Sequence, residues 1–214
     1  MKQSTAPVRR SIKPSGSMQS GVSLVIVMIF LVILSGLAIS AMQGSTFSAR
    51  VAGNESDRTL AFQAAEAALK DAEHDLSSVL ADGTTACPIP STVCRAEPIS
   101  RGDGFDTTCP NGRCIPVPRC TPPATCTQPA HNWEITANWT NAAPADNTVV
   151  VNGSVIYGFY TNATPLPVVA QQPRYLIEYF KQGDFSVYRV TAVGYGANSS
   201  TQAILQSAVK ARQL

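Results

Sequence analysis

The chain has 214 residues, of which 44% are hydrophobic and 14% charged, a composition that suits one globular domain or one small domain plus an extended element. The net charge is +2, but four of the 16 basic residues precede residue 22, whereas all 14 acidic residues follow it. The part after residue 21 therefore carries a net negative charge. This argues against binding to nucleic acid, which needs a concentrated basic surface.

The N-terminal segment joins a basic stretch to a long uncharged one. Basic residues at positions 2, 9, 10 and 13 are followed by no charged residue before Arg50, and residues 22–42 are almost wholly aliphatic. As a helix, these 21 residues would extend about 30 Å, the thickness of the hydrocarbon core of a bilayer. Because basic flanks stay in the cytoplasm, the sequence predicts one membrane span with the N-terminus inside and the rest of the chain outside.

The junction at Gly21 differs from a secretory signal peptide, in which small residues follow the apolar core. Here a hydrophilic leader ends in Gln19-Ser20-Gly21 and the apolar run begins at once. Cleavage after Gly21 would remove the leader and retain the span. The residues alone leave this interpretation and an uncleaved signal anchor with a basic tail equally open.

The helical pattern continues beyond the span, and it predicts one helix over about residues 22–79. Glu66 and Lys70 form an i,i+4 pair in the favourable order. Glu66, Asp71 and Glu73 are expected to form an acidic face directed to solvent or to another subunit. The opposite face carries a stripe of apolar residues at three- and four-residue steps, which needs a sheet to cover it: Phe47, Val51, Leu60, Ala64, Ala68, Leu69, Ala72, Leu76 and Leu80.

The following segment is rich in Pro, Thr, Gly and Cys, which excludes a regular helix or a central strand. Its six cysteines fall on the predicted outer side of the membrane, where an even number indicates three disulfides with 15 possible connectivities; short-range pairs are favoured. A zinc site is the weaker interpretation, since no Cys-x-x-Cys occurs. The cysteines are Cys87, Cys94, Cys109, Cys114, Cys120 and Cys126.

The last third of the chain has the pattern of a sheet. Residues 133–139 alternate in the period of a strand, with Trp133 and Trp139 on one face that we expect in the core. Asn152-Gly153 within residues 149–157 predicts a hairpin. Residues 175–180 and 185–193, joined by a turn at 181–184, and residues 201–211 complete an antiparallel meander. A long helix packed on this sheet is an α+β fold.

No catalytic constellation is found in the sequence. It has no nucleophile elbow, no phosphate-binding glycine loop and no zinc-protease motif. Asp103 and Asp106 provide too few ligands for a calcium site. His74 is expected in solvent and His131 in a turn. We therefore expect a protein that is not an enzyme and holds neither cofactor nor metal.

The basic leader, Gly21 and the apolar helix resemble the class III signal of type IV prepilins. Residues 50–73 are similar to the N-terminal region of PilX-type pilus assembly proteins, and the wording "AGN…DR…AFQAAEAAL…AE" carries the likeness. The resemblance implies a pilin-like fold and a minor pilin that acts by packing. It covers residues 19–76 strongly and the C-terminal strands loosely. The residues of this assembly motif are Gly53, Asn54, Arg58, Phe62, Glu66 and Glu73.

The resemblance also implies processing and partners. In this family a prepilin peptidase cleaves after the glycine, here Gly21, and methylates the new amine, here that of Val22. Most pilins carry glutamate at the fifth mature position, where this chain has Ile26. A carboxylate in lipid needs a partner, so its absence suggests a subunit at the leading end of the filament. The expected partners are other minor pilins, the major pilin, the inner-membrane assembly platform and a tip adhesin.

The expected organisation is a leader (1–21), a long helix (22–80, with 22–42 in the membrane), a disulfide-stapled loop region (81–130) and a sheet head (131–214). The chain would reside in the bacterial inner membrane with its head in the periplasm, and then in the pilus. The loop region is either a contact surface or a passive, protease-resistant spacer. A minor pseudopilin of a type II secretion system and a single-span periplasmic receptor or enzyme are the alternative functions.

Overall fold

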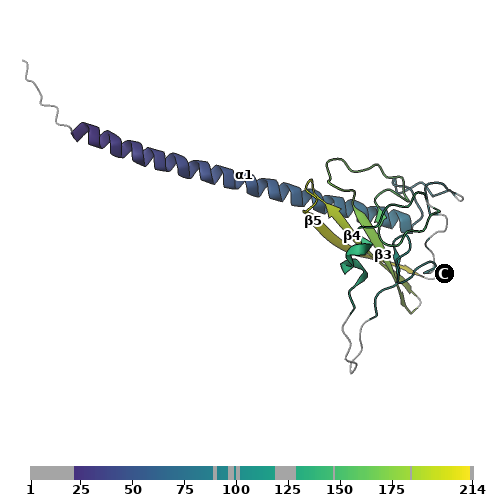
Figure 1. Cartoon of the computed structure of the whole chain (residues 1–214). Coiled ribbons are helices and arrows are strands. Elements are labelled where there is room, and N and C mark those ends of the chain that lie inside the picture. Colours follow the sequence, from purple (N-terminus) through teal and green to yellow (C-terminus); the bar gives the residue numbers. More distant parts are fainter. Residues whose placement is uncertain are drawn as a thin grey trace, which may run out of the picture. The chain divides into compact units, whose positions relative to one another are not determined.

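The computed structural model describes residues 22–88, 91–95, 99, 102–118, 129–146, 148–183 and 185–212. One long helix, α1 (Val22–Leu76), precedes the sheet (Figure 1). The strands are β1 (Arg113–Cys114), β2 (Val155–Ile156), β3 (Arg174–Gln182), β4 (Phe185–Tyr195) and β5 (Gln202–Arg212). The contacts within the chain divide it into two units, residues 22–51 and the part from Ala52 onward, and each is described by itself.

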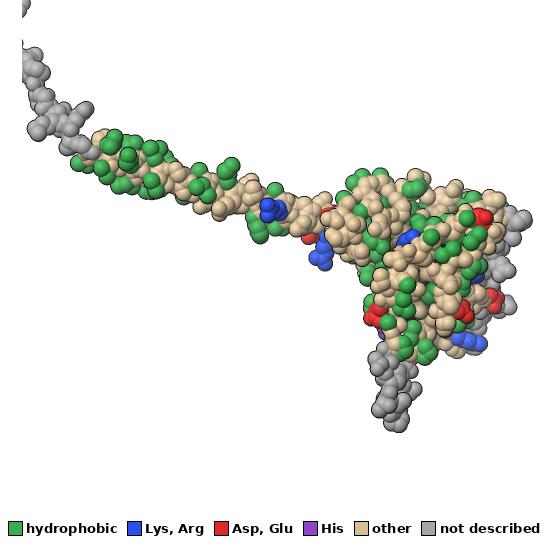
Figure 2. Space-filling model, in the orientation of Figure 1, with side chains coloured by type: hydrophobic (Ala, Val, Ile, Leu, Met, Phe, Trp, Pro, Cys, Tyr) green, Lys and Arg blue, Asp and Glu red, His purple; other side chains and the backbone are tan. Residues whose placement is uncertain are grey.

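The first unit is the N-terminal part of α1, in which residues 22–51 are all exposed. Apolar side chains cover this part of the helix (Figure 2), and an 18-residue window with a mean hydropathy of 3.0 makes it long and apolar enough to cross a membrane. The hydroxyls of Ser35 and Ser40 donate to carbonyl oxygens four residues earlier, at 2.6 and 3.0 Å. These serines therefore leave no open donor on the apolar surface, as a membrane anchor requires.

The helix ends at Leu76, three residues before the predicted end at 79. Ser78 has a left-handed φ of 53°, and the amide of Val79 donates to the carbonyl of His74 at 3.0 Å. This backward bond satisfies a free carbonyl at the helix end and turns the chain away from the axis.

The apolar stripe that the sequence predicts on the helix is buried, as expected, only in the second unit. Ala64, Ala68 and Ala72 are buried, and the helix adds Ala61 and Ala65 to the same face. Phe47 and Val51, in the first unit, are exposed. The small alanine side chains allow the backbone of the helix to lie close to the sheet.

The three long strands form the antiparallel meander that the sequence predicts, in the order β3-β4-β5. The β3–β4 turn includes Gly183, whose φ of 60° favours glycine. The Cys-rich region adds β1, which pairs with β3 in parallel at Arg113 and Ile177, and β2 pairs with β3 in antiparallel fashion. The sheet is therefore mixed.

The strand predicted over 133–139 is wrong. Two 3-10 helices, η1 (Asn132–Glu134) and η2 (Thr136–Asn138), occupy this segment. The Glu134 carboxylate accepts the His131 amide at 2.8 Å, and the indole N–H of Trp139 donates to the Trp133 carbonyl at 2.9 Å. These local bonds satisfy the segment without a neighbouring strand, and Trp139 packs beside Leu176 of β3.

The hairpin predicted at Asn152-Gly153 is also wrong. The backbone of this segment bonds to the Cys-rich region: the Asn111 amide donates to the Val151 carbonyl at 2.7 Å, and the Gly153 amide donates to the Cys109 carbonyl at 2.9 Å. Gly153 does adopt a positive φ, 107°. The glycine turns the chain as expected, but the partner is a distant segment.

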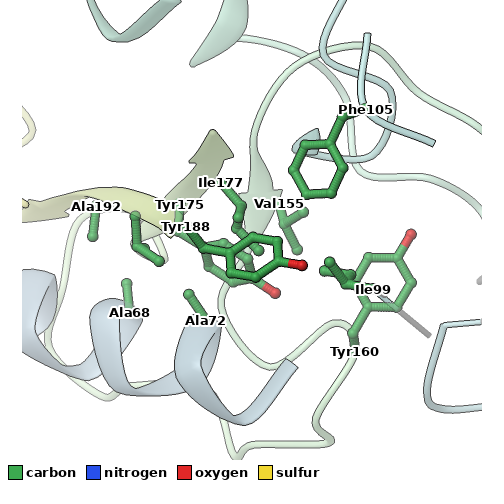
Figure 3. Packing of buried hydrophobic residues seen from close by; sticks show 11 residues of the cluster. Ala68, Ala72, Ile99, Phe105, Val155, Tyr160, Tyr175, Ile177, Tyr188 and Ala192 are labelled. Atoms are coloured by element: carbon green, nitrogen blue, oxygen red, sulfur yellow. The ribbon is translucent and has the colours of Figure 1, made fainter. Parts of the chain in front are cut away.

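The main core lies between the C-terminal part of α1 and the sheet (Figure 3). Ile99 and Phe105 belong to it, so the Cys-rich region is more than a surface loop. The Phe105 ring lies 5.5 Å from that of Tyr179 and 6.0 Å from that of Tyr188. The buried members are Ala68, Ala72, Ile99, Phe105, Val155, Tyr160, Tyr175, Ile177, Tyr188, Val190 and Ala192.

Candidate functional site

The predicted assembly motif is exposed along most of its length. Gly53, Asn54, Arg58 and Glu66 are exposed, and Phe62 keeps 45% of its surface in solvent. Glu73 is half-buried and pairs with Lys70 at 3.0 Å, in place of the Glu66–Lys70 pair that the spacing suggested. The alanines of the same run face the sheet. The motif therefore has an inner face that builds the head and an outer face that is open to other molecules.

Two glycines of the sheet fix the position of α1 on it. A Cβ at Gly194 of β4 would lie 2.2 Å from the Ala61 carbonyl oxygen and from the Ala65 amide nitrogen, and one at Gly196 would lie 2.4 Å from Oδ1 of Asp57. The Asp57 carboxylate accepts the amide of Ala197 at 2.6 Å. Residues 194–196, at the end of β4, are thus the contact at which helix and sheet meet.

Two aspartates lie on the buried face of α1 in its last two turns, where the helix dipole disfavours negative charge. Asp71, which the sequence places on a solvent-facing acidic face, is buried: it accepts the Gly158 amide at 2.8 Å and the Thr161 hydroxyl. Burial, opposed by these two hydrogen bonds and aided by the charge of Asp75, raises the pKa of Asp71 from 3.8 to about 6.

Asp75 forms a buried ion pair with Arg95, with the Arg95 Nε and Nη2 donating to its carboxylate at 2.7 Å each. The Tyr175 hydroxyl donates to the same carboxylate at 2.8 Å. The guanidinium carbon also lies 4.0 Å from the centre of the Tyr160 ring. Burial, together with the charge of Asp75, raises the pKa of Tyr175 above its usual value of 10, so its hydroxyl stays protonated as a donor. We call Asp71, Asp75, Arg95, Thr161 and Tyr175 the helix-end cluster.

A second ion pair ties the loops to the face of the sheet that points away from α1. The carboxylate of Glu178, which is 1% exposed, accepts Nε of Arg189 at 2.7 Å and Nη2 at 2.6 Å. Asn132 of η1 donates to the same carboxylate at 3.0 Å and to the Ile115 carbonyl at 2.8 Å. This network holds η1 and the end of the Cys-rich region against β3 and β4.

Four of the predicted cysteines are disulfide-bonded, Cys87 to Cys94 and Cys109 to Cys114, both over short sequence separations. Cys120 and Cys126 lie outside the described residues, as does Gly21.

The carboxylate of Asp106, which the sequence offers as a possible calcium ligand, accepts the Thr108 amide at 3.0 Å. Within the described ranges there is no group of three or more His, Cys, Asp or Glu side chains that could hold a metal ion.

The exposed part of α1 begins, in the described chain, with Val22 and includes Ile26, which is 50% exposed. Gly36, Ser40, Gly44 and Ser48 recur at every fourth position and form one ridge of small side chains. A Cβ at Gly36 or Gly44 would meet no atom of this chain within 4 Å. Small residues on a helix allow another helix to approach its backbone closely, so this ridge is suited to helix–helix packing.

Strand β5 forms one edge of the sheet and, among the described residues, pairs only with β4. Its stretch from 202 to 209 has no charged residue, glycine or proline. Ile204 is 51% exposed on it. Charged residues and prolines commonly protect such edges from pairing with other chains, so β5 is a second surface open to a partner.

Comparison with known proteins agrees with this architecture at both ends of the chain. A family model described as PilX N-terminal matches residues 20–70, and one described as Type IV pilus assembly protein PilX C-term matches residues 111–211. No curated protein and no solved structure matches the chain. The two family matches confirm the likeness drawn from residues 19–76, and they extend it over the sheet. The chain belongs to the PilX family of type IV pilus assembly proteins.

Proposed function

We propose that this chain is a minor pilin that takes part in starting the assembly of type IV pili, at or near the tip of the filament. The observation that carries the proposal is the division of α1: residues 22–51 are all exposed, whereas the inner face of its C-terminal part builds the head. A helix with a large apolar surface that no described part of the chain covers needs lipid or other helices around it. A pilin meets both in turn.

The anchor would lie first in the inner membrane, with the N-terminus in the cytoplasm and the head in the periplasm. The prepilin peptidase would cleave after Gly21 and methylate Val22. The assembly platform would then transfer the helix from lipid to a bundle of pilin helices, where the ridge of Gly36, Ser40, Gly44 and Ser48 allows close packing. Ile26, in place of the usual glutamate, suits a subunit that has no neighbour ahead of it.

The outer face of the assembly motif is the proposed contact with other minor pilins and the major pilin, and a tip adhesin could be held by the loops of the head. Arg58, Phe62 and Glu66 place a cation, an aromatic ring and an anion along one side of the helix. Aromatic and arginine side chains commonly anchor protein interfaces. The match of both family models favours a pilus over a type II secretion pseudopilus.

Processing is tested by mass spectrometry of the native protein from cells with and without the prepilin peptidase. A methylated Val22 at the N-terminus, present only with the peptidase, is the expected result. A chain that keeps its leader in cells with active peptidase would contradict the proposal and favour a signal-anchored receptor.

Assembly is tested with Phe62→Glu and the matched control Gln63→Glu, both at exposed positions of α1. Each variant places a new carboxylate within one turn of Glu66, so their effects on the helix itself are similar. Phe62→Glu should lower the number of pili per cell at unchanged protein level, whereas Gln63→Glu should not. Equal piliation in the two strains would remove Phe62 from the contact.

A further inference from the structure

The ion pair of the helix-end cluster depends on a residue that the sequence places next to a disulfide. Arg95 directly follows Cys94, and both are buried. The guanidinium reaches Asp75 on the last turn of α1. A buried guanidinium loses its hydration, and its carboxylate and aromatic contacts offset that loss only while the geometry is kept.

The other cysteine of the pair is fixed to the end of α1. The Cys87 amide donates to the Ser78 carbonyl at 2.9 Å, and the Leu80 amide donates to the Thr85 carbonyl at 2.9 Å. These bonds make residues 78–87 a tight turn attached to the helix. The Ala81 amide also donates to the Thr161 carbonyl at 2.9 Å, which ties this turn to the segment that binds Asp71.

We propose that the Cys87–Cys94 disulfide holds Arg95 against Asp75, so that the attachment of the Cys-rich region to α1 is redox-sensitive. The disulfide joins the turn at residues 78–87 to the residue just before Arg95, and so supplies a covalent tie at the point where the ion pair forms. This inference concerns the folding of the head and holds whether or not the chain acts at a pilus tip. Arg95 and both cysteines lie between the segments matched by the two family models.

Reduction would proceed by thiol–disulfide exchange with a dithiol. A thiolate of the dithiol attacks Sγ of Cys87, the more exposed of the two cysteines, and Cys94 leaves as a thiolate that takes up a proton. The second thiol of the reductant then displaces Cys87, whose sulfur is protonated in turn. Two electrons and two protons pass to the protein, and the reductant becomes a disulfide. Arg95 is then joined to the helix-end turn only through the intervening polypeptide, and it separates from Asp75.

The test is a mutant cycle on the full chain in detergent micelles, with the unfolding midpoint of the head followed by near-ultraviolet circular dichroism. The proteins are the wild type, Cys87→Ser/Cys94→Ser, Arg95→Met, and the triple variant. If the disulfide acts through Arg95, the triple variant should have the midpoint of the less stable parent. A triple variant whose loss equals the sum of the two separate losses would overturn the proposal.

The second disulfide supplies the matched control. Cys109 and Cys114 lie in a cluster with Leu176, apart from the helix-end cluster. The losses caused by Cys109→Ser/Cys114→Ser and by Arg95→Met should therefore add. If the losses from Cys109→Ser/Cys114→Ser and Arg95→Met are as non-additive as those from Cys87→Ser/Cys94→Ser and Arg95→Met, the coupling is a general property of a weakened head. The proposal then fails.

If Arg95→Met alone unfolds the head, the proposal can still be tested by amide hydrogen exchange on a variant that lacks both charges. Asp75→Asn/Arg95→Met removes both charges and leaves neither partner buried and charged. Dithiothreitol should raise amide exchange in residues 70–80 of the wild type several-fold, and should change it much less in this double variant. An equal rise in both proteins would overturn the proposal, as would no rise in the reduced wild type.

Discussion

Gly194 of β4 lies against Ala65 of α1 so closely that a Cβ on the glycine would be 2.2 Å from the alanine amide nitrogen. The contact joins two halves of the chain that lie far apart in sequence. It fixes the crossing point of helix and sheet, because on this face only a residue without a side chain allows the two backbones to approach this closely.

Gly194→Ala should therefore destabilise the head by about 3 kcal/mol or more, since the new methyl meets helix backbone that cannot move without separating α1 from the sheet. Gly53→Ala is the control. It lies at an exposed position of the same helix with nothing within 4 Å of a Cβ built there, and it should stabilise the helix by about 1 kcal/mol. Denaturant unfolding of the two variants in detergent measures both, and equal effects would contradict the close contact.

Asp71 should make the stability of the head depend on pH between about 4 and 6. Its pKa is raised from 3.8 to about 6 in the folded protein, so the folded state holds the proton more tightly than the unfolded state. Its contribution is fully present below pH 3.8 and is lost as pH rises through 6, by about 3 kcal/mol in total. Asp71→Asn should remove this slope, and parallel pH profiles of variant and wild type would show that the carboxyl titrates normally.

The buried ion pair of Glu178 and Arg189 should contribute much more to the stability of the head than the exposed ion pair of Lys70 and Glu73. Arg189→Met leaves the Glu178 carboxylate buried without its cation, which should cost about 3 kcal/mol. Lys70→Ala removes a pair whose side chains are 65% and 37% exposed, and it should change stability by less than about 0.5 kcal/mol. Unfolding midpoints at low and high salt provide the comparison, and a large loss from Lys70→Ala would reverse this order.

The Cys-rich region should prove necessary for folding of the head. Phe105→Ala removes a ring packed between Tyr179 and Tyr188 and should cost about 3–4 kcal/mol. Val150→Ala, at a side chain that is 61% exposed, should cost less than about 0.5 kcal/mol. Thermal unfolding distinguishes the two. Deletion of residues 84–128 would remove Arg95 and Phe105 together, so a loss of partner binding in that deletion would report unfolding and could not identify a contact surface.

Ile26→Glu tests the proposed position in the filament. A glutamate at this place should let the subunit enter the filament among ordinary pilins, so labelled protein should spread along pili while assembly continues. The measurement is immunogold labelling in a strain that also carries the unaltered protein. Loss of pili in that strain would count against a role at the leading end.

The helix and the long strands could be predicted because their patterns are local. The uncharged run, the alanine-rich stripe and the alternating residues of 175–180, 185–193 and 201–211 each specify an element without reference to distant residues. The same stripe held a signal that sequence reasoning missed: Asp71 and Asp75 follow Ala64, Ala68 and Ala72 on the buried face. Charges on that face predict a buried partner, which is Arg95 for Asp75.

The segments that sequence reasoning assigned wrongly depend on partners far along the chain. Residues 133–139 alternate like a strand, but Asn132 reaches Glu178, 46 residues away. The Asn152-Gly153 pair has turn chemistry, but the carbonyl of Val151 before it accepts the amide of Asn111, 40 residues earlier. The contact at Gly194 shows no local sign at all, since a glycine near a strand end is usually a turn residue.

The order of exposed and buried residues along α1 sets what the chain can satisfy by itself. Among the described residues, the first buried side chain of the helix is that of Ala61. The exposed residues 22–51 must obtain most of their van der Waals contacts from lipid or from other molecules. The core of the head is built from side chains of this chain, whereas the anchor is covered only by lipid or by a larger assembly, so the packing of the anchor depends on its neighbours.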